Sequence, residues 1–152
     1  ERLLAGRAEL STSAARVHVV SGRGERVLIV DDEPSVCSFL SEILSRRGYR
    51  AESLVDSREA LVRVRQQPSS FDLLITDLTM PQVTGLELID ALREAHGDLP
   101  VLLCSGYADS VDTAQLNDHT VFLHKPVRAA DLVSQVQSLL EAAPGQRAGD
   151  GV

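Results

Sequence analysis

The chain has 152 residues, of which 43% are hydrophobic, so its composition suits one domain with a real core and excludes a disordered protein. Its net charge of −7 and its isoelectric point near 5.0 argue against a direct nucleic-acid-binding protein, which usually carries a basic surface. No apolar run approaches the roughly 20 residues needed to span a bilayer, and no signal peptide is visible, so we expect a cytoplasmic protein without membrane contact.

Both ends of the chain lack a clear apolar pattern. We interpret residues 1–24 as a linker or the end of an upstream segment, and the glycine-rich residues 143–152 as a flexible tail. One folded domain is therefore predicted over residues 25–142. Because the sequence starts with Glu1 rather than Met, we expect it to be a segment of a longer protein.

Between these ends, apolar runs of strand length alternate with segments of helical periodicity. The predicted strands cover residues 26–31, 50–54, 71–77, 99–105 and 121–125. The predicted helices begin near residues 34, 57, 85 and 128, and a weakly patterned one is expected within 109–117. Four of the strands are apolar at nearly every position, which is typical of parallel strands covered on both faces. The alternation predicts an α/β fold with a doubly wound parallel sheet.

Residues that favour helix ends mark the limits of the predicted helices. Pro34 suits a first turn, and Gly48 suits the end of the same helix. Ser57 can act as the N-cap of the next helix, which ends before Pro68. Gly85 starts the helix that follows the third strand.

Four strands run into residues that phosphate chemistry requires. The first runs into Asp31 and Asp32, and the third, fourth and fifth end in Asp77, Ser105 and Lys125. Ligands of open α/β sheets bind outside the carboxyl ends of the strands, so these groups are expected to meet at one site. Three neighbouring carboxylates repel one another, and a divalent cation would compensate for their charge.

The same strand ends carry a family likeness. The segments VLIVDDEP (27–34), LLITDLTMPQVTG (73–85), LLCSGY (102–107) and FLHKPV (122–127) together resemble the receiver domain of two-component response regulators. The stretches TDLTMP and CSGY look especially like the C-terminal receivers of hybrid sensor histidine kinases. The resemblance implies a flavodoxin-like fold of five parallel strands in the order 2-1-3-4-5. It also implies a signalling module that phosphorylates and dephosphorylates itself, rather than an enzyme.

The resemblance assigns a role to each acidic residue of the predicted site. Asp77 is the phosphoacceptor, whose carboxylate attacks phosphorus and forms an acyl phosphate. Asp32 and Asp77 are direct Mg²⁺ ligands, and the backbone carbonyl of Thr79 is a third. Asp31 acts on the ion through water, and Glu33 in the same loop has no assigned role.

A lysine, a hydroxyl and an aromatic residue complete the implied site. Lys125 reaches the phosphoacceptor as a compact positive charge, and a cis Lys125–Pro126 bond would aim it inward. Ser105 matches the hydroxyl that binds a phosphoryl oxygen after transfer. Phe122 matches the switch aromatic, which moves inward in response to that change. For Phe122, the alternative is plain core packing.

The phosphodonor is expected to be a histidine kinase or a phosphotransfer domain, because none of the four histidines here lies in a helical context suited to phosphohistidine. The downstream partner cannot be read from the sequence, and a homodimer stays open. The two cysteines, Cys37 and Cys104, are expected to be buried thiols. Only 20 positions separate Ser105 from Lys125, fewer than the family suggests, so the helix within 109–117 is expected to be short or irregular.

Three other functions compete with this interpretation. A Mg²⁺-dependent phosphohydrolase on a similar sheet usually has a DxD nucleophile loop, and Asp77-Leu78-Thr79 lacks the second aspartate that would act as general acid. A nucleotide-binding Rossmann domain would carry GxGxxG after its first strand. A receiver that works without phosphorylation would not need the acidic pair, Asp77 and Lys125 together.

Overall fold

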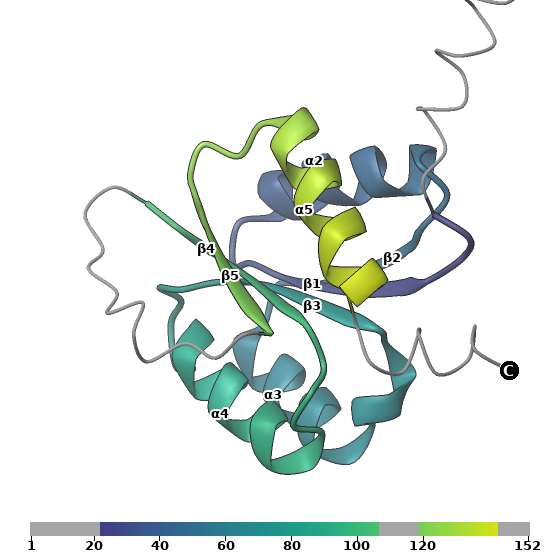
Figure 1. Cartoon of the computed structure of the whole chain (residues 1–152). Helices are drawn as coiled ribbons and strands as arrows, with labels where there is room; N and C mark the ends of the chain where they lie inside the picture. The colour runs from purple at the N-terminus through teal and green to yellow at the C-terminus, as the bar shows by residue number, and fades with distance from the viewer. Residues whose placement is uncertain (1–21, 107–118, 143–152) are drawn as a thin grey trace, which may run out of the picture.

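Five parallel strands form a single sheet with helices on both of its faces (Figure 1). The structure is a computed structural model, and it describes residues 22–106 and 119–142. The strands follow the order β2-β1-β3-β4-β5. The doubly wound α/β fold with strand order 2-1-3-4-5, expected from the sequence, is therefore confirmed.

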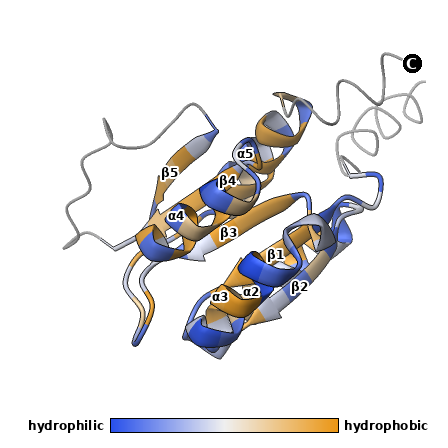
Figure 2. Ribbon diagram, turned by 90° about the horizontal axis from the view of Figure 1, so that it is seen from below, coloured by the Kyte–Doolittle hydropathy of each residue, from blue (hydrophilic) through white to orange (hydrophobic). Residues whose placement is uncertain are grey.

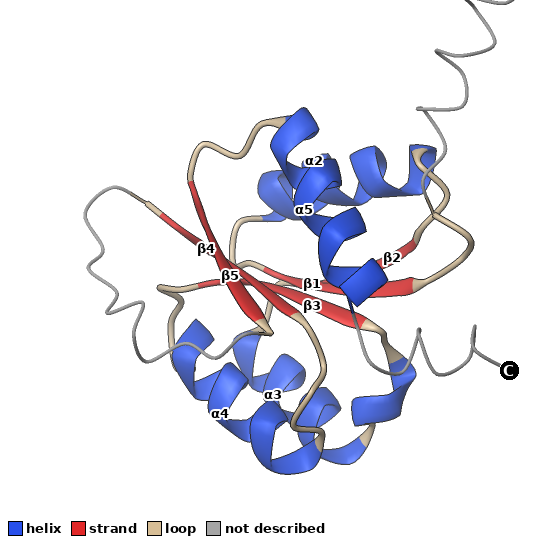
Figure 3. Cartoon of the chain, viewed as in Figure 1, coloured by secondary structure: helices blue, strands red, loops and turns tan. Residues whose placement is uncertain are grey.

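Strands and helices alternate along the described chain as far as β4 (Figure 3). The strands are β1 (Arg26–Val30), β2 (Arg50–Leu54), β3 (Leu73–Asp77), β4 (Val101–Ser105) and β5 (Thr120–His124). The helices are α2 (Pro34–Arg46), α3 (Ser57–Gln66), α4 (Gly85–Ala95) and α5 (Ala129–Ala142), with a short 3-10 helix η1 (Pro68–Ser70). The helix expected within residues 109–117 lies outside the described residues. In the part of the chain that is described, no helix is both long and apolar enough to cross a membrane.

Two hydrophobic layers, one on each face of the sheet, hold these elements together. Successive strand residues point to opposite faces. Ile29 of β1 accordingly shares a core cluster with residues of α2 and α5, whereas Leu28 shares one with residues of α3 and α4. The central strands are apolar on both faces and are predominantly orange in Figure 2. Burial of each large aliphatic side chain contributes about 2 kcal/mol, so the sheet is a stable platform for whatever lies at its carboxyl edge.

Asp56 is the N-cap of helix α3. The sequence had suggested Ser57 for this position, and that prediction is wrong. The Asp56 carboxylate accepts a hydrogen bond from the Arg58 amide at 2.9 Å. Aspartate and serine are about equally good N-caps, so propensity alone could not choose between these neighbours. The tertiary structure decides, because Ser57 is buried and its hydroxyl bonds to the loop after β3 instead.

Helix α4 starts against the end of β3, where only a glycine fits. A Cβ on Gly85 would overlap the Asp77 carbonyl oxygen and lie 3.0 Å from the Cα of Leu78. The Gly85 amide donates to the Leu78 carbonyl at 2.8 Å, which closes the loop between β3 and α4. A capping box of Thr84 and Glu87 fixes the first turn of the helix. The loop that follows Asp77 is thus held tightly at its far end.

Replacing Gly85 with alanine should lower the free energy of unfolding by about 2 kcal/mol, because the added methyl group must displace backbone. Urea unfolding measures the effect. The matched control is Gly97→Ala, whose Cβ would meet no atom closer than 3.7 Å. That control should change stability by less than about 0.5 kcal/mol. Equal losses in the two variants would contradict the steric explanation.

Candidate functional site

Three aspartates meet at the carboxyl ends of two adjacent strands. Asp31 and Asp32 follow β1, Asp77 ends β3, and these strands pair directly in the sheet. Each residue offers a carboxylate oxygen, and the three oxygens lie within 4.8 Å of one another. Asp31 and Asp77 are buried, whereas Asp32 is exposed. The aspartate cluster (Asp31, Asp32 and Asp77) is therefore reachable from solvent on the side of Asp32.

Lys125 joins the aspartate cluster from the segment that follows β5. Its Nζ lies 2.9 Å from Oδ2 of Asp31 and 3.1 Å from Oδ1 of Asp77. Glu33, to which the sequence gave no role, lies at the margin with Oε1 4.0 Å from the same nitrogen. The Lys125–Pro126 bond is cis, as predicted. Lys125 is the one lysine of the chain, so a single ammonium side chain serves this cluster.

The charges of the site do not balance. Burial raises the pKa of the Asp77 carboxyl above its usual value, and the neighbouring Asp31 and Asp32 raise it further, whereas Lys125 lowers it. For Lys125, burial alone would lower the pKa, but the contacts with Asp31 and Asp77 raise it overall, so this side chain is a permanent cation. One ammonium therefore serves the three carboxyl groups of the aspartate cluster, and it compensates for only part of their charge.

The aspartate cluster fits the requirements of Mg²⁺. This ion takes oxygen ligands, keeps several waters and binds through one or two carboxylates. The spacing of the three carboxylate oxygens allows them to share one ion, and the excess negative charge favours its binding. Thr79, two residues after Asp77, is exposed on the adjoining loop. The residues present are thus compatible with the ion that the sequence led us to expect.

Ser105 and Phe122 lie on the neighbouring strands. Ser105 ends β4, is fully buried, and its carbonyl accepts the Lys125 amide at 2.8 Å, which ties Lys125 to β4. Phe122 in β5 is only half-buried; it packs against the core cluster beneath α3 and α4. Its ring meets that of His124 edge-on at a centroid distance of 4.7 Å. Phe122 therefore lies between the core and the surface rather than deep inside.

The cysteines and the remaining histidines that the structure describes contribute no group to the aspartate cluster, although Sγ of Cys37 donates to the Asp31 carbonyl at 3.3 Å. Cys37 and Cys104 are free and buried, as predicted, and burial raises the pKa of Cys104 to about 12. His96 follows the last turn of α4. His119 lies 3.5 Å from Asp98. None of these residues belongs to the aspartate cluster.

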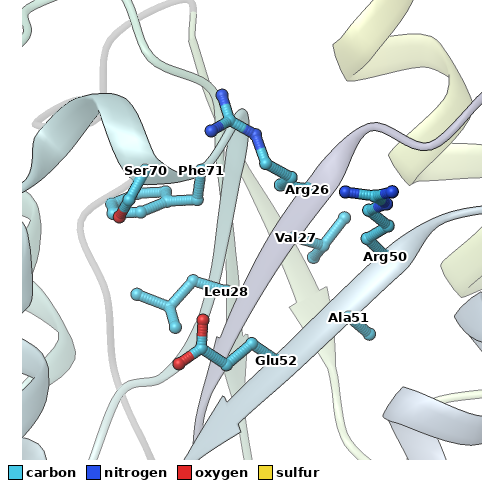
Figure 4. A pocket seen from close by; sticks show the side chains of 8 residues that line it. All are labelled: Arg26, Val27, Leu28, Arg50, Ala51, Glu52, Ser70 and Phe71. Carbon is cyan, nitrogen blue, oxygen red and sulfur yellow. The ribbon is translucent and has the colours of Figure 1, made fainter.

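A hollow of about 220 Å³ lies at the opposite, amino ends of β1 and β2 (Figure 4). Its lining residues are Arg26, Val27, Leu28, Arg50, Ala51, Glu52, Ser70 and Phe71. Arg26 is already paired with Asp72 at 3.1 Å, and Glu52 is paired with Arg63 at 2.5 Å. Two of the three charges that line the hollow therefore have partners within the chain, and the hollow is separate from the aspartate cluster.

Sequence reasoning missed two residues that shape the site. Gly85 was assigned only as a helix start, but its packing against Asp77 excludes any side chain. Ser57 was assigned as a cap, but its hydroxyl bonds to the loop after Asp77. The glycine at the end of the LLITDLTMPQVTG segment could have indicated a close approach of backbone. No local pattern indicated the contact of Ser57, because its partner lies 24 residues away.

A doubly wound sheet with an aspartate cluster and a lysine at its carboxyl edge defines a class of phosphate-handling signalling domains. The chain belongs to the response regulator receiver domain family, which matches residues 27–137. It is a receiver domain of two-component signalling.

Relatives of known sequence and structure agree with this assignment. The response regulator receiver protein CpdR of Brucella abortus (strain 2308) is 31% identical, over 78% of this chain and 99% of CpdR. The two-component response regulator ARR18 of Arabidopsis thaliana is 37% identical, over 72% of this chain but 17% of ARR18. The structure of the chemotaxis protein CheY4 of Vibrio cholerae is similar, with a TM-score of 0.67, 32% identity and coverage of 77% of this chain and 99% of CheY4. The chain therefore spans nearly all of the single-domain relatives and less than a fifth of ARR18.

Replacing Asp77 with asparagine should raise the free energy of unfolding at pH 7 without Mg²⁺. Folding raises the pKa of Asp77, so the folded state holds the proton more tightly and the ionised carboxylate destabilises it. The advantage of the variant should shrink as the pH falls towards about 4, the ordinary pKa of aspartate, because the folded state takes up its proton over that range. Urea unfolding between pH 4 and pH 8 measures this dependence.

The control for this measurement is Asp90→Asn, which alters an exposed aspartate of α4. It should change the free energy of unfolding by less than about 0.5 kcal/mol across the range. A loss of stability in Asp77→Asn at pH 7 would show that the ion pair with Lys125 outweighs the cost of burial.

Proposed function

We propose that this receiver domain accepts a phosphoryl group on Asp77, in a Mg²⁺-dependent reaction, from a histidine kinase or a phosphotransfer domain. The observation that carries the proposal is the position of Asp77 inside the aspartate cluster, with Oδ1 3.1 Å from Nζ of Lys125. A carboxylate placed in this way combines a nucleophilic oxygen with a cation that can neutralise the charge of an incoming phosphoryl group.

The surroundings of the other two aspartates favour Asp77 as the nucleophile. Both oxygens of Asp31 are engaged, because Oδ1 accepts the Glu33 amide at 2.9 Å and Oδ2 accepts Lys125 at 2.9 Å. Asp32 is exposed and has no contact with Lys125 within the described residues. Oδ2 of Asp77 has no hydrogen-bond partner in the described part of the chain, so it is available for attack.

For the metal, we propose Asp32, Asp77 and the backbone carbonyl of Thr79 as direct ligands, with Asp31 acting through water. When bound, Mg²⁺ would neutralise part of the charge on the phosphoryl oxygens. The support for this set is the spacing of the three carboxylate oxygens and the exposure of Asp32 and Thr79 to solvent.

In the proposed reaction, a carboxylate oxygen of Asp77 forms a bond to phosphorus while the bond from phosphorus to the imidazole nitrogen of the donor breaks. The imidazole leaves and takes a proton from solvent. Lys125 stays protonated and shifts from the Asp77 oxygen towards a phosphoryl oxygen. The protein supplies orientation and charge, which is most of what phosphoryl transfer needs. The chemistry is therefore confined to the domain's own phosphorylation and dephosphorylation, without turnover of a separate substrate.

We extend the proposal to a conformational switch that uses Ser105 and Phe122. Ser105 lies at the end of β4, next to the strand that carries Asp77, so its hydroxyl can turn towards a new phosphoryl oxygen. Phe122 is half-buried against the core cluster of α3 and α4, so an inward movement would increase its burial. A new charge at Asp77 would then bias two packings of the same segment.

The wider context also belongs to this proposal. The sensor kinase CckA of Brucella abortus matches this chain at 31% identity over 12% of its length, and a receiver domain of a hybrid histidine kinase named CckA has a similar structure, with 30% identity, a TM-score of 0.64 and coverage of 76% of this chain and 98% of that one. These matches support a receiver within a hybrid kinase as well as a free-standing one. We also propose that the domain acts in the cytoplasm, as expected from the sequence.

Replacing Asp77 with asparagine should abolish labelling by phosphoramidate or acetyl phosphate in the presence of Mg²⁺. Asparagine keeps the shape of the side chain but has no anionic oxygen to attack phosphorus. Intact-mass spectrometry and phosphate-affinity gels measure the base-labile adduct, and Asp90→Asn should label like the wild type. Full labelling of Asp77→Asn would show that another residue is the phosphoacceptor. Absence of labelling in the wild type would favour a receiver that works without phosphorylation. Sustained turnover of a small phosphate ester would favour the hydrolase.

Replacing Lys125 with alanine should slow phosphorylation by about 100-fold, the usual cost of removing one group that stabilises developing negative charge. Lys125→Arg keeps the charge but replaces a compact ammonium with a larger planar group, so its rate should lie between those of Lys125→Ala and the wild type. Stopped-flow measurement at saturating Mg²⁺ gives these rates. A wild-type phosphorylation rate in Lys125→Ala would show that Lys125 has no role in the reaction.

A further inference from the structure

The loop between Asp77 and α4 contains a turn of unfavourable backbone geometry. Gln82 has a φ of 67°, and it is the one residue other than glycine with a positive φ among those the structure describes. The amide of Val83 donates to the carbonyl of Pro81 at 2.8 Å, two residues back. Together these features describe a γ-turn whose central residue lies in the left-handed region, a rare and strained form. Such a turn persists only where its surroundings hold it.

The hydroxyl of Ser57 contacts both ends of this turn. It donates to the Pro81 carbonyl at 2.6 Å and accepts from the Val83 amide at 3.2 Å. Ser57 is 3% exposed and is the first residue of α3, so its position is fixed by the helix and by the buried layer around it. A hydroxyl is one donor and two acceptors, so one group can satisfy a carbonyl and an amide at the same time.

The other end of the loop is held by the sheet and by α4. The Leu78 amide donates to the Cys104 carbonyl of β4 at 2.8 Å, and the Leu78 carbonyl accepts from Gly85 at 2.8 Å. Only Thr79 and Met80 lie between Leu78 and Pro81, and Met80 is buried. The backbone of Thr79 is therefore fixed from two directions, by β4 on one side and by Ser57 on the other.

We propose that Ser57 is a positioning residue for the phosphoacceptor site. Its hydroxyl stabilises the strained turn at Gln82 and thereby holds the Thr79 backbone where its carbonyl can act as a ligand of Mg²⁺. This inference rests on the proposed function, because it assigns Ser57 a role in the affinity of the same site. Loss of the hydroxyl allows the turn to relax and moves the Thr79 carbonyl away from the aspartate cluster.

The test is a Mg²⁺ titration of the full chain, monitored by ¹H–¹⁵N NMR in the absence of a phosphodonor. Ser57→Ala should bind Mg²⁺ about three- to tenfold more weakly than the wild type, which is the range expected for loss of one or two neutral hydrogen bonds. Asp56 still caps α3 in this variant, and alanine favours a helix more than serine does, so the fold is retained. Far-UV circular dichroism verifies this.

Labelling with phosphoramidate separates positioning from chemistry. The rate for Ser57→Ala should fall at low Mg²⁺ and return to within about twofold of the wild-type rate at saturating Mg²⁺, because the nucleophile and Lys125 are unchanged. A labelling rate of Ser57→Ala that stays low at saturating Mg²⁺ would contradict a role of Ser57 confined to metal affinity.

The matched control is Ser70→Ala. Ser70 also donates its hydroxyl to a backbone carbonyl, that of Gln67 at 2.7 Å, but it lies in η1, beyond the end of α3. This control should leave the Mg²⁺ affinity unchanged. An equal loss of affinity in Ser70→Ala and Ser57→Ala would assign the effect to general destabilisation and overturn the proposal.

A second substitution tests the strained turn itself. Glycine adopts a positive φ without steric cost, so Gln82→Gly should restore most of the affinity lost in Ser57→Ala. A role of Ser57 limited to folding α3 would not be rescued in this way.

The proposal is overturned if Ser57→Ala binds Mg²⁺ as tightly as the wild type, or if the double variant with Gln82→Gly regains no Mg²⁺ affinity. If the wild type binds Mg²⁺ but takes no label, the proposed function fails while the binding measurements still decide the role of Ser57.

Discussion

The contacts of Lys125 with Asp31 and Asp77 are the interaction on which the site depends. They link three strands, because Asp31 follows β1, Asp77 ends β3, and Lys125 follows β5. Without this ammonium, two buried carboxylates would face each other in a medium that stabilises charge poorly, and such an arrangement is costly. The lysine offsets part of that cost and leaves a net negative charge. That remainder suits the binding of a divalent cation, and it is the basis for proposing Asp77 as the phosphoacceptor.

The rest of the fold keeps this charged cluster in place. Strands buried on both faces form a platform that deforms little, since close-packed interiors transmit displacement rather than absorb it. The loop after β3 is the part of the site with least regular structure, and it is held by contacts from β4, α4 and α3. Gly85 lets α4 pack directly on Asp77, Leu78 bonds to β4, and Ser57 supports the strained turn. A loop fixed in this way can present a backbone carbonyl to a metal with little cost of ordering.

Much of this arrangement could be predicted from the sequence, because the strands are nearly continuous apolar runs. Each predicted strand agrees with the observed one to within two residues at either end. The errors concern helix α3 and the loops. Asp56 and Ser57 are adjacent and have similar capping preferences, so only their environments separate them. The 3-10 helix η1 (Pro68–Ser70) was not predicted, because three residues give no periodic pattern.

The sequence by itself determined the class of fold and the chemical groups at the strand ends, because burial of a parallel sheet on both faces leaves a pattern in every strand. It also indicated which residues could meet, since parallel strands end at one edge. Only the tertiary structure decided the finer geometry. It paired Lys125 with Asp31 as well as Asp77, and it directed Ser57 to a loop 24 residues away. Contacts of this kind depend on how helices pack on the sheet, and no local pattern of residues encodes that packing.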